Sequence, residues 1–172
     1  MNMWLVGAGY WGSKLLDNLE RLGVSAKVID IRNGQTIDDI NTNDPVMLAT
    51  PLWQHHKQTI QLLQRGHDVY VEKPLAESAA QVLEISQCVA DNQLLMVGHL
   101  FIHHPQMLEI KSLIKHIGNI VHVSSRRLNW GIYQTKTDPL LSLATHDISI
   151  IQEITGQQLV PDNARAWNYS NN

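Results

Sequence analysis

The stretch Gly7-Ala8-Gly9-Tyr10-Trp11-Gly12 decides the fold of this chain. It spells GxGxxG between a short apolar run at residues 3–6 and a stretch in which leucines recur at helical spacing, at positions 15, 16, 19 and 22. In this context the first glycine allows a tight turn, the second lets a ligand approach the backbone, and the third lets helix and strand pack closely. The helix begins with unpaired N–H groups and a positive dipole end. A pyrophosphate is therefore expected over Gly7, Gly9 and Gly12.

The acidic partner of this turn is Asp30, at the end of the next strand that the sequence predicts. It follows the glycines by about 20 residues, the spacing at which a carboxylate binds both ribose hydroxyls of a dinucleotide and repels a 2′-phosphate. Asp30 thus favours NAD over NADP. Arg32 could instead pair with a 2′-phosphate, so NADP stays open as the alternative cofactor. We expect Tyr10 and Trp11 beside the turn, and Ile31 and Arg32 beside Asp30, to line the same site.

Alternating elements predict an α/β protein, a doubly wound parallel sheet of the Rossmann type followed by the start of a second α/β domain. The sheet is expected to have strands at 3–6, 26–31, 46–49, 68–71 and 94–97, with amphipathic helices between them. Beyond the sheet, the sequence predicts a helix at 106–117, a half-buried strand at 120–128 and a helix at about 141–155.

These elements divide the chain into a Rossmann domain at 1–118 and a partial second domain at 119–172. The second piece is small for an independent core. Either the chain is shortened at its C-terminus relative to its relatives, or this piece packs against the first domain or a partner. The residues after about 166 are polar and expected to fray.

The composition argues against several classes of partner. With 44% hydrophobic and 17% charged residues and a formal net charge of −3, the chain is typical of globular proteins. Its 13 lysines and arginines are scattered, so no basic stripe for nucleic acid is expected. The N-terminus has neither a basic region nor a long apolar run, so we expect no signal peptide and no membrane-spanning helix there. The single cysteine, Cys88, fits a reducing cytoplasm.

Nine histidines raise the question of a metal site, above all the neighbouring pairs His55-His56 and His103-His104. Adjacent side chains do not share one face of a helix or a strand. No cysteine or carboxylate stands at a recognisable ligand spacing from them. We therefore expect no metal.

Four stretches give the chain a resemblance to the Gfo/Idh/MocA family of oxidoreductases, which pair a Rossmann domain with a C-terminal α/β domain. They are the glycine turn, Ala49-Thr50-Pro51 with His55, Glu72-Lys73-Pro74, and Thr145-His146-Asp147 within LLSLATHDISII. The third of these, directly after a buried strand, is the most specific. Within the family, SSRRLNWG at 124–131 together with THDISII is similar to the nucleotide-sugar branch, the 3-dehydrogenases of UDP-N-acetyl amino sugars.

The resemblance implies an NAD(P)-dependent dehydrogenase that transfers a hydride between the nicotinamide and a sugar hydroxyl. Lys73, at the carboxyl edge of the sheet, would hold the substrate oxygen, and His146, which titrates near neutral pH, would be the general base. The peptide bond before Pro74 is expected to be cis. Further cofactor contacts are expected from Ala49, Thr50, Pro51, His55, Glu72, Lys73 and Pro74, and substrate contacts from His99, Arg127, Asn129 and Ser142.

For these residues ordinary structural roles stay open: a solvated lysine at a strand end, a histidine lining a helix, or arginines on a solvated sheet face. Two departures from the family also leave activity open. Relatives usually carry an aspartate four residues before the catalytic histidine, where Ser142 brings no charge, and they continue well beyond residue 172.

The alternative function is therefore a non-catalytic nucleotide-binding or assembly module derived from this family. A third reading is a doubly wound domain that binds no nucleotide. Because the second domain of relatives often forms the subunit interface, a homo-oligomer is expected.

Overall fold

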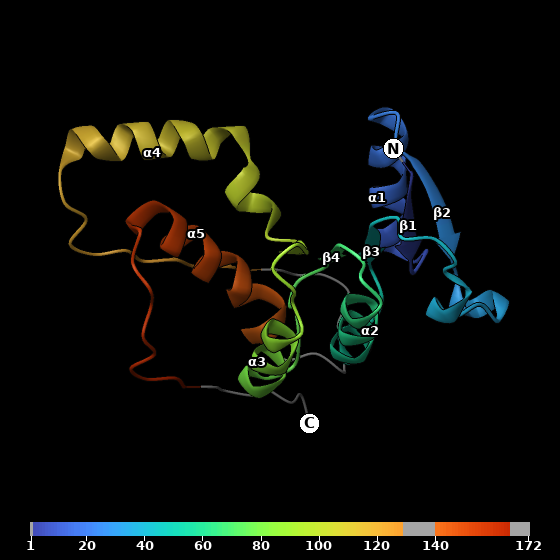
Figure 1. Ribbon diagram of the computed structural model, residues 1–172. Helices are drawn as coiled ribbons and strands as arrows, with labels where there is room; N and C mark the ends of the chain where they lie inside the picture. The colour runs from blue at the N-terminus through green and yellow to red at the C-terminus, as the bar shows by residue number, and fades with distance from the viewer. Residues whose placement is uncertain (1, 129–139, 166–172) are drawn as a thin grey trace, which may run out of the picture.

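The computed structural model describes residues 2–128 and 140–165, which contain an α/β Rossmann fold (Figure 1). Its sheet has five parallel strands in the order β2-β1-β3-β4-β5. The strands are β1 (Asn2–Val6), β2 (Ser25–Ile29), β3 (Val46–Leu48), β4 (Val69–Val71) and β5 (Leu95–Val97). Each lies within two residues of its predicted bounds, so the predicted strands and the Rossmann fold class are confirmed.

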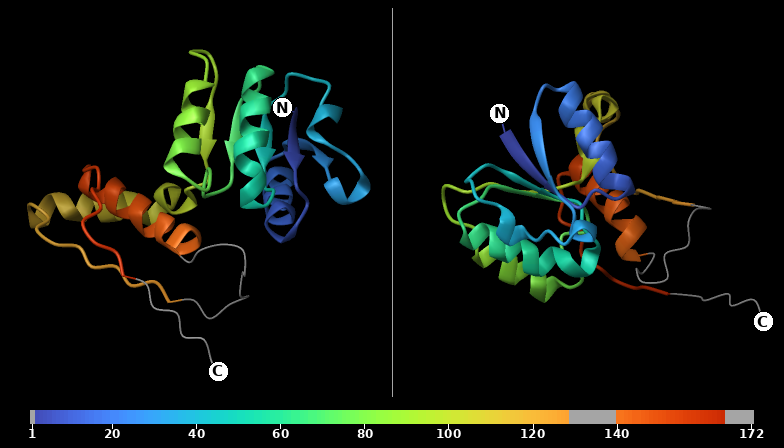
Figure 2. Two further views of the ribbon diagram at one scale, coloured as in Figure 1. Left: turned by 90° about the horizontal axis from the view of Figure 1, so that it is seen from below. Right: turned by 90° about the vertical axis from the view of Figure 1, so that its right-hand side faces the viewer.

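The strands carry consecutive apolar residues because helices cover both faces of the sheet. Helix α1 (Tyr10–Arg21) lies on one face, and α2 (Leu52–Gln64) and α3 (Ala79–Gln87) lie on the other (Figure 2). The core consists of buried residues from the strands and a few from the helices. It includes Leu5, Leu48 and Val71 of the strands, Leu62 of α2 and Ile85 of α3. Leu22 was expected in the α1 stripe but is 77% exposed, because α1 ends at Arg21 and the helical spacing no longer holds beyond it.

The direction in which successive strands are added to the sheet reverses after β1 and β2. From β1 the chain passes to β2 on one side and then returns to β3 on the other, so the loops after β1 and β3 diverge. Doubly wound folds bind ligands at the carboxyl ends of their strands at such a point. The glycine turn follows β1 and Ala49-Thr50-Pro51 follows β3, so both predicted segments flank it.

After β5 the chain forms a short 3-10 turn, η3 (Leu100–His103), and then helix α4 (Pro105–Ile117). A π-helical turn, η4 (Leu140–Ala144), leads into α5 (Thr145–Thr155). The helices predicted at 106–117 and 141–155 are therefore confirmed. α4 and α5 lie side by side, and Lys111 of α4 forms an ion pair of 2.5 Å with Glu153 of α5 (Figure 1).

The strand predicted at 120–128 is wrong, since this segment has no regular secondary structure. A strand needs a neighbour that satisfies its N–H and C=O groups, and the described part of the chain offers none at this place. Val121 is accordingly 97% exposed. The division into domains at residue 118 stays a prediction.

No helix within residues 2–128 and 140–165 has both the length and the apolar character that a bilayer crossing requires.

Candidate cofactor and active site

The glycine turn after β1 is closed by packing at its ends and open in its middle. Gly7 has a φ of 96°, and a Cβ there would lie 2.7 Å from the Ala49 carbonyl oxygen. A Cβ at Gly12 would overlap the Gly7 carbonyl oxygen, whereas a Cβ at Gly9 would meet no atom within 4 Å. Gly9 is the N-cap of α1, and no side chain of the described residues caps that helix. The first N–H groups of α1 are therefore available to an anion above Gly9.

Asp30 faces this turn, but its carboxylate is already engaged by Arg32. The Arg32 Nε lies 2.9 and 3.0 Å from the two carboxylate oxygens, and its Nη2 donates to Oδ2 at 2.6 Å. The same Nη2 donates to the carbonyl oxygen of Ala8, inside the glycine turn, at 2.9 Å. The Arg32 side chain holds the pKa of Asp30 below its ordinary value, mainly through these hydrogen bonds. Asp30 is thus an ionised acceptor beside the turn, as a ribose-binding carboxylate must be.

The other residues predicted near the turn are exposed around it. Tyr10 and Trp11 begin α1, and Lys14 Nζ lies 4.9 Å from the centre of the Tyr10 ring. Ile31 lines a cavity of about 390 Å³ between the loop after β2 and helix α2, together with Trp53. This cavity offers an apolar floor next to Asp30.

Thr50 and His55 face the protein interior rather than the open sheet edge. The Thr50 hydroxyl donates to Gln58 Oε1 at 2.7 Å. His55 is only 2% exposed, and its two ring nitrogens lie 2.8 Å from the carbonyl oxygens of Pro74 and Thr50. The ring therefore links the loop after β3 to the loop after β4, so its effect on a cofactor would pass through the backbone it holds. Pro51 is the N-cap of α2.

The loop after β4 carries Glu72, Lys73 and Pro74. The Lys73-Pro74 bond is cis, as the family resemblance implies. Glu72 is buried and accepts a hydrogen bond of 2.9 Å from the Tyr70 hydroxyl. Gly98 makes room for this pair, because a Cβ there would overlap the Tyr70 hydroxyl and lie 3.2 Å from the Glu72 carboxyl carbon. The carboxylate thus has a fixed place beneath Lys73.

Lys73 reaches from the sheet edge to the turn before α5. Its Nζ donates to the backbone carbonyl oxygen of Ser142 at 2.8 Å, across 69 positions of the sequence. Burial lowers the pKa of Lys73, Arg127 lowers it further, and the nearby Glu72 opposes both. Ser142 therefore contributes its main chain to the site.

His146 lies in the first turn of α5, near enough to Lys73 to be affected by its charge. Its Nδ1 is buried without a hydrogen-bond partner among the described residues, and its ring packs edge-on against Phe101 with 4.9 Å between ring centres. Burial, and then the positive charges of Lys73 and Arg127, lower the pKa of His146 to about 4. The ring is neutral at neutral pH, which is the form that accepts a proton.

Arg127 is held by Asp147, the neighbour of His146. Its Nε and Nη2 donate to the two carboxylate oxygens of Asp147 at 2.8 and 2.9 Å. The guanidinium also lies 5.2 Å from the centre of the Phe101 ring. Arg127 therefore reaches the site but has its fork turned to a carboxylate of the protein. Asn129, the other predicted residue of this segment, lies outside the described residues.

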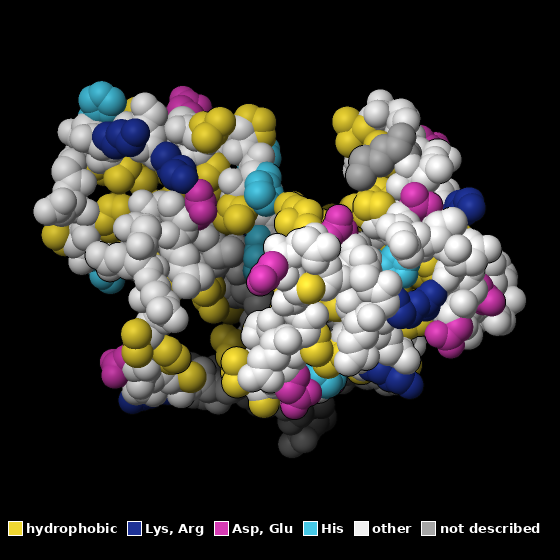
Figure 3. Space-filling model, in the orientation of Figure 1, with side chains coloured by type: hydrophobic (Ala, Val, Ile, Leu, Met, Phe, Trp, Pro, Cys, Tyr) yellow, Lys and Arg dark blue, Asp and Glu magenta, His cyan; other side chains and the backbone are white. Residues whose placement is uncertain are grey.

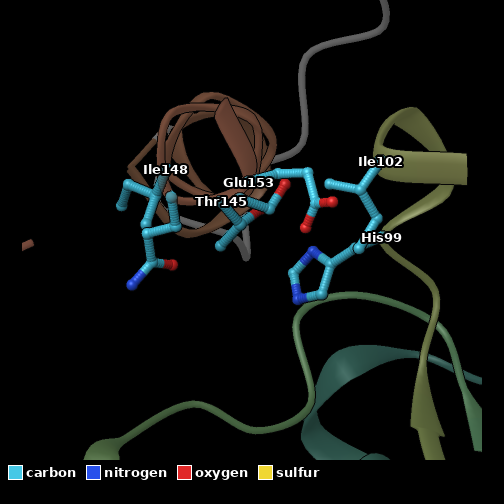
Figure 4. Close-up of a pocket in the computed structure, with 7 residues that line it drawn as sticks. His99, Ile102, Thr145, Ile148 and Glu153 are labelled. Carbon is cyan, nitrogen blue, oxygen red and sulfur yellow. The ribbon is translucent and has the colours of Figure 1, made fainter. Parts of the chain in front are cut away.

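A cavity of about 370 Å³ separates η3 from α5. His99 points into it opposite Thr145 and Glu153 (Figure 4). Burial and the charge of Lys73 lower the pKa of His99, whose Nδ1 is buried without a partner among the described residues. In the space-filling view, histidine side chains gather beside the hollow between the lobe of α4 and the lobe of α1 (Figure 3). Of the predicted substrate residues that the structure describes, His99 is the one that lines this cavity.

Two residues of the site, Phe101 and Tyr70, were not identified from the sequence, and Asp147 was named there only as part of the motif around His146. Phe101 and Asp147 fix His146 and Arg127, and Tyr70 fixes Glu72. The sequence could have indicated Tyr70, because it stands two residues before Glu72 and residues two apart on a strand share a face. Within the described ranges, no group of three histidine, cysteine, aspartate or glutamate side chains could hold a metal ion.

The fold, the glycine turn and its acidic partner are those of the Rossmann class of α/β domains. Residues 20–99 match the model of the Gfo/Idh/MocA family, described as an oxidoreductase family with an NAD-binding Rossmann fold. This part of the chain is therefore similar to that family, in agreement with the resemblance that the sequence motifs predict.

The relatives are longer than this chain. The 2,7-anhydro-N-acetylneuraminate hydratase of Mediterraneibacter gnavus is 29% identical over 147 residues, which cover 73% of this chain and 39% of the hydratase. GenD2 from gentamicin A biosynthesis, in complex with NAD, has a TM-score of 0.73 at 21% identity, covering 91% of this chain and 54% of that chain. Levoglucosan dehydrogenase, in complex with NADH and levoglucosan, has a TM-score of 0.69 at 20% identity, with the same coverage of 91% and 54%. These two structures share the fold of this chain, and the chain spans about half of their length.

Proposed function

We propose that this chain is the cofactor-binding part of an NAD(H)-dependent oxidoreductase that acts on a hydroxyl of a sugar. One juxtaposition carries the proposal. The Arg32 guanidinium bonds both to the Asp30 carboxylate and to Ala8 beside the open backbone at Gly9. Lys73 after β4 lies near enough to the neutral His146 of α5 for its charge to lower the pKa of that ring. The first pair can hold a dinucleotide, and the second can act on an alcohol.

The turn and β2 would hold the cofactor by its phosphates and its adenosine ribose. The free N–H groups at the start of α1 would bind the pyrophosphate, and Asp30 would accept from the ribose hydroxyls. The cavity beside Ile31 and Trp53 fits a flat ring next to that ribose. The nicotinamide, when bound, supplies the hydride acceptor.

Lys73 and His146 would divide the remaining work on the alcohol. The Lys73 ammonium has three donors, of which one is directed to Ser142, so others can hold the substrate oxygen as negative charge develops. His146 would accept the proton of the substrate hydroxyl while the hydride leaves the carbon that bears this hydroxyl. In the opposite direction the protonated ring would return that proton to a carbonyl oxygen.

The substrate class follows from the family and remains our proposal. Levoglucosan, named in the complex of one structural relative, is a sugar derivative, and a curated relative is a hydratase of a neuraminate derivative. The motif at 124–131 favours a nucleotide-linked sugar. We further propose a homo-oligomer in which residues 1–118 and 119–172 are distinct domains, which light scattering and limited proteolysis near Gly118 can test.

The first test is a titration of NADH fluorescence with the whole chain. We expect saturable binding, and the absence of binding at millimolar NADH would end the proposal. Lys73→Ala then tests chemistry, because the variant should keep its affinity for NADH and lose about 100-fold or more in turnover of a sugar substrate. Lys115→Ala, at an exposed position near the end of α4, is the matched control.

A non-catalytic nucleotide-binding module is the second candidate function. Ser142 favours it, because the position brings a carbonyl to Lys73 and no carboxylate to His146. A panel of sugars and UDP-sugars with NAD distinguishes the two candidates. The module binds NADH and turns over none of them, whereas the enzyme turns over at least one in a Lys73-dependent way.

A further inference from the structure

The Glu72 carboxylate is buried at the carboxyl end of β4 and is held by Tyr70 of the same strand. The Tyr70 hydroxyl donates to Glu72 Oε1 at 2.9 Å, and Glu72 is only 7% exposed. The two side chains share a face, because residues two apart along an extended strand do so. Burial and the charge of Glu72 raise the pKa of Tyr70. The phenol therefore stays a hydrogen-bond donor beyond the pH at which a free tyrosine loses its proton.

The hydroxyl and the carboxylate pack directly on the backbone that follows β5. Gly98 lies beside Glu72, since Val71 and Val97 are partners in the parallel register of β4 and β5. A Cβ at Gly98 would overlap the Tyr70 hydroxyl and lie 3.2 Å from the Glu72 carboxyl carbon. Packing and the hydrogen bond together therefore set the position of the carboxylate.

Charges of both signs act on the half-buried Lys73. Burial and Arg127, from the segment after α4, lower the pKa of Lys73, whereas the charge of Glu72 raises it. The other titratable groups whose charges couple to Lys73 are His99 after β5 and His146 of α5. Both rings are neutral above pH 7, because burial lowers their pKa. The balance on Lys73 is therefore between the carboxylate on one side and burial with Arg127 on the other.

We propose that Tyr70 is a positioning residue for the candidate catalytic lysine: its hydroxyl holds the Glu72 carboxylate where the negative charge keeps Lys73 an ammonium ion. The use of that ammonium at a substrate oxygen rests on the proposed function. Without the hydroxyl, the buried carboxylate loses a donor and either takes up a proton or turns toward solvent. In both cases its charge acts less on Lys73. Burial then favours the neutral amine, which brings no charge to a developing oxyanion.

The test measures the charge of Lys73 directly and needs neither substrate nor cofactor. Acetic anhydride in trace amounts acetylates the neutral amine, and peptide mass spectrometry of the whole chain gives the extent at Lys73 between about pH 7 and 11. The midpoint for Lys73 should lie at lower pH in Tyr70→Phe than in the wild type. Lys115, exposed on α4, is the internal reference, and its midpoint should be the same in both proteins.

Thr42→Val is the matched control for the loss of a hydroxyl. Thr42 Oγ1 donates to Asp44 Oδ2 at 2.7 Å, again two residues apart, but it lies before β3 at the opposite edge of the sheet. This variant should leave the Lys73 midpoint unchanged. Glu72→Gln removes the charge and keeps the shape, so its midpoint should fall at least as far as that of Tyr70→Phe. In the double variant, Tyr70→Phe should add nothing to Glu72→Gln, because the hydroxyl acts through the charge.

An identical Lys73 midpoint in Tyr70→Phe and the wild type would overturn this role of Tyr70, as would an equal shift in Thr42→Val. A full effect of Tyr70→Phe in the Glu72→Gln background would show that Tyr70 acts through packing instead. None of these outcomes depends on the proposed function, which fails separately if the wild type binds no NADH. Where a sugar is turned over, Tyr70→Phe should move the alkaline limb of turnover to lower pH, while turnover near neutral pH changes little.

Discussion

The two ends of the candidate site are built in different ways. At the cofactor end, the glycine turn is fixed by backbone against backbone, with Gly7 and Gly12 packed where no side chain fits and β1 buried beneath them. At the candidate catalytic end, η4 and α5 are held by side chains that reach across the sequence from the loop after β4 and from the segment after α4. Lys73 bonds to Ser142, and Arg127 pairs with Asp147.

Because of this difference, some substitutions should damage the fold and others only the chemistry. A change in the turn acts on both packing and ligand, because the same backbone does both. A change around His146 acts on charge and position, while the core of the sheet stays intact. Substitutions at the two ends should therefore separate stability, cofactor affinity and turnover from one another.

The largest effect is expected at His146. In His146→Asn the general base is lost, and turnover of the sugar substrate should fall by about 10² to 10⁴. The NADH dissociation constant should stay unchanged, because the turn at the other end is untouched. His116→Asn, at an exposed position in α4, provides the control. Equal turnover in His146→Asn and the wild type would remove the histidine from the mechanism.

The next effect contrasts two glycines of one turn. Gly12→Ala forces a Cβ onto the Gly7 carbonyl and should lower the unfolding free energy, measured by urea denaturation, by about 1–3 kcal/mol. The same variant should lose NADH binding. Gly9→Ala meets open space, so stability should change by less than about 0.5 kcal/mol. Its methyl group stands where the phosphate would lie, and NADH affinity should fall about tenfold. A Gly9→Ala variant with wild-type affinity contradicts this arrangement.

The pH dependence tests the electrostatics around His146. Protonation removes the base, and the pKa of about 4 places that loss below pH 5 rather than near 6.5. Turnover between about pH 5.5 and 7.5 should therefore be flat with respect to this group. In Arg127→Ala one of the charges that depress the pKa is gone, so the acid limb should move upward. A wild-type limb centred near pH 6.5 would show that His146 is not buried among cations.

The smallest effect concerns the tie between Arg127 and Asp147. Both side chains are partly exposed, and the pair is bidentate, so Arg127→Ala should lower the unfolding free energy by about 1 kcal/mol or less. Arg126→Ala is the neighbouring control, because the Arg126 side chain is exposed. A much larger loss of unfolding free energy would mean that the Arg127–Asp147 ion pair stabilises more of the protein than α5.

The cofactor end was predictable from the sequence because each step there is local. The apolar runs gave the strands within two residues, and the glycine spacing predicted which position is open and which are packed. The same rules misjudged 120–128, since apolar alternation says nothing of whether a partner strand is present.

At the candidate catalytic end, the sequence predicted which residues come near one another but not their contacts. Thr145-His146-Asp147 begins α5, whose preceding turn Lys73 contacts. Nothing in the local sequence predicts that Lys73 donates to the Ser142 carbonyl in the turn before α5. Every residue has a main-chain carbonyl, so residue type does not reveal which one accepts. The burial of His55 and the folding of Arg32 onto Asp30 likewise depend on tertiary position and rotamer.

The proposed function requires a dinucleotide to lie over the glycine turn. Amide chemical-shift mapping by ¹⁵N NMR during addition of NADH measures this directly. We predict the largest saturable shifts at the amides of Gly9, Tyr10 and Trp11, with a second group around Asp30 and Arg32. Saturable shifts confined to other parts of the chain, or none at millimolar NADH, would contradict it.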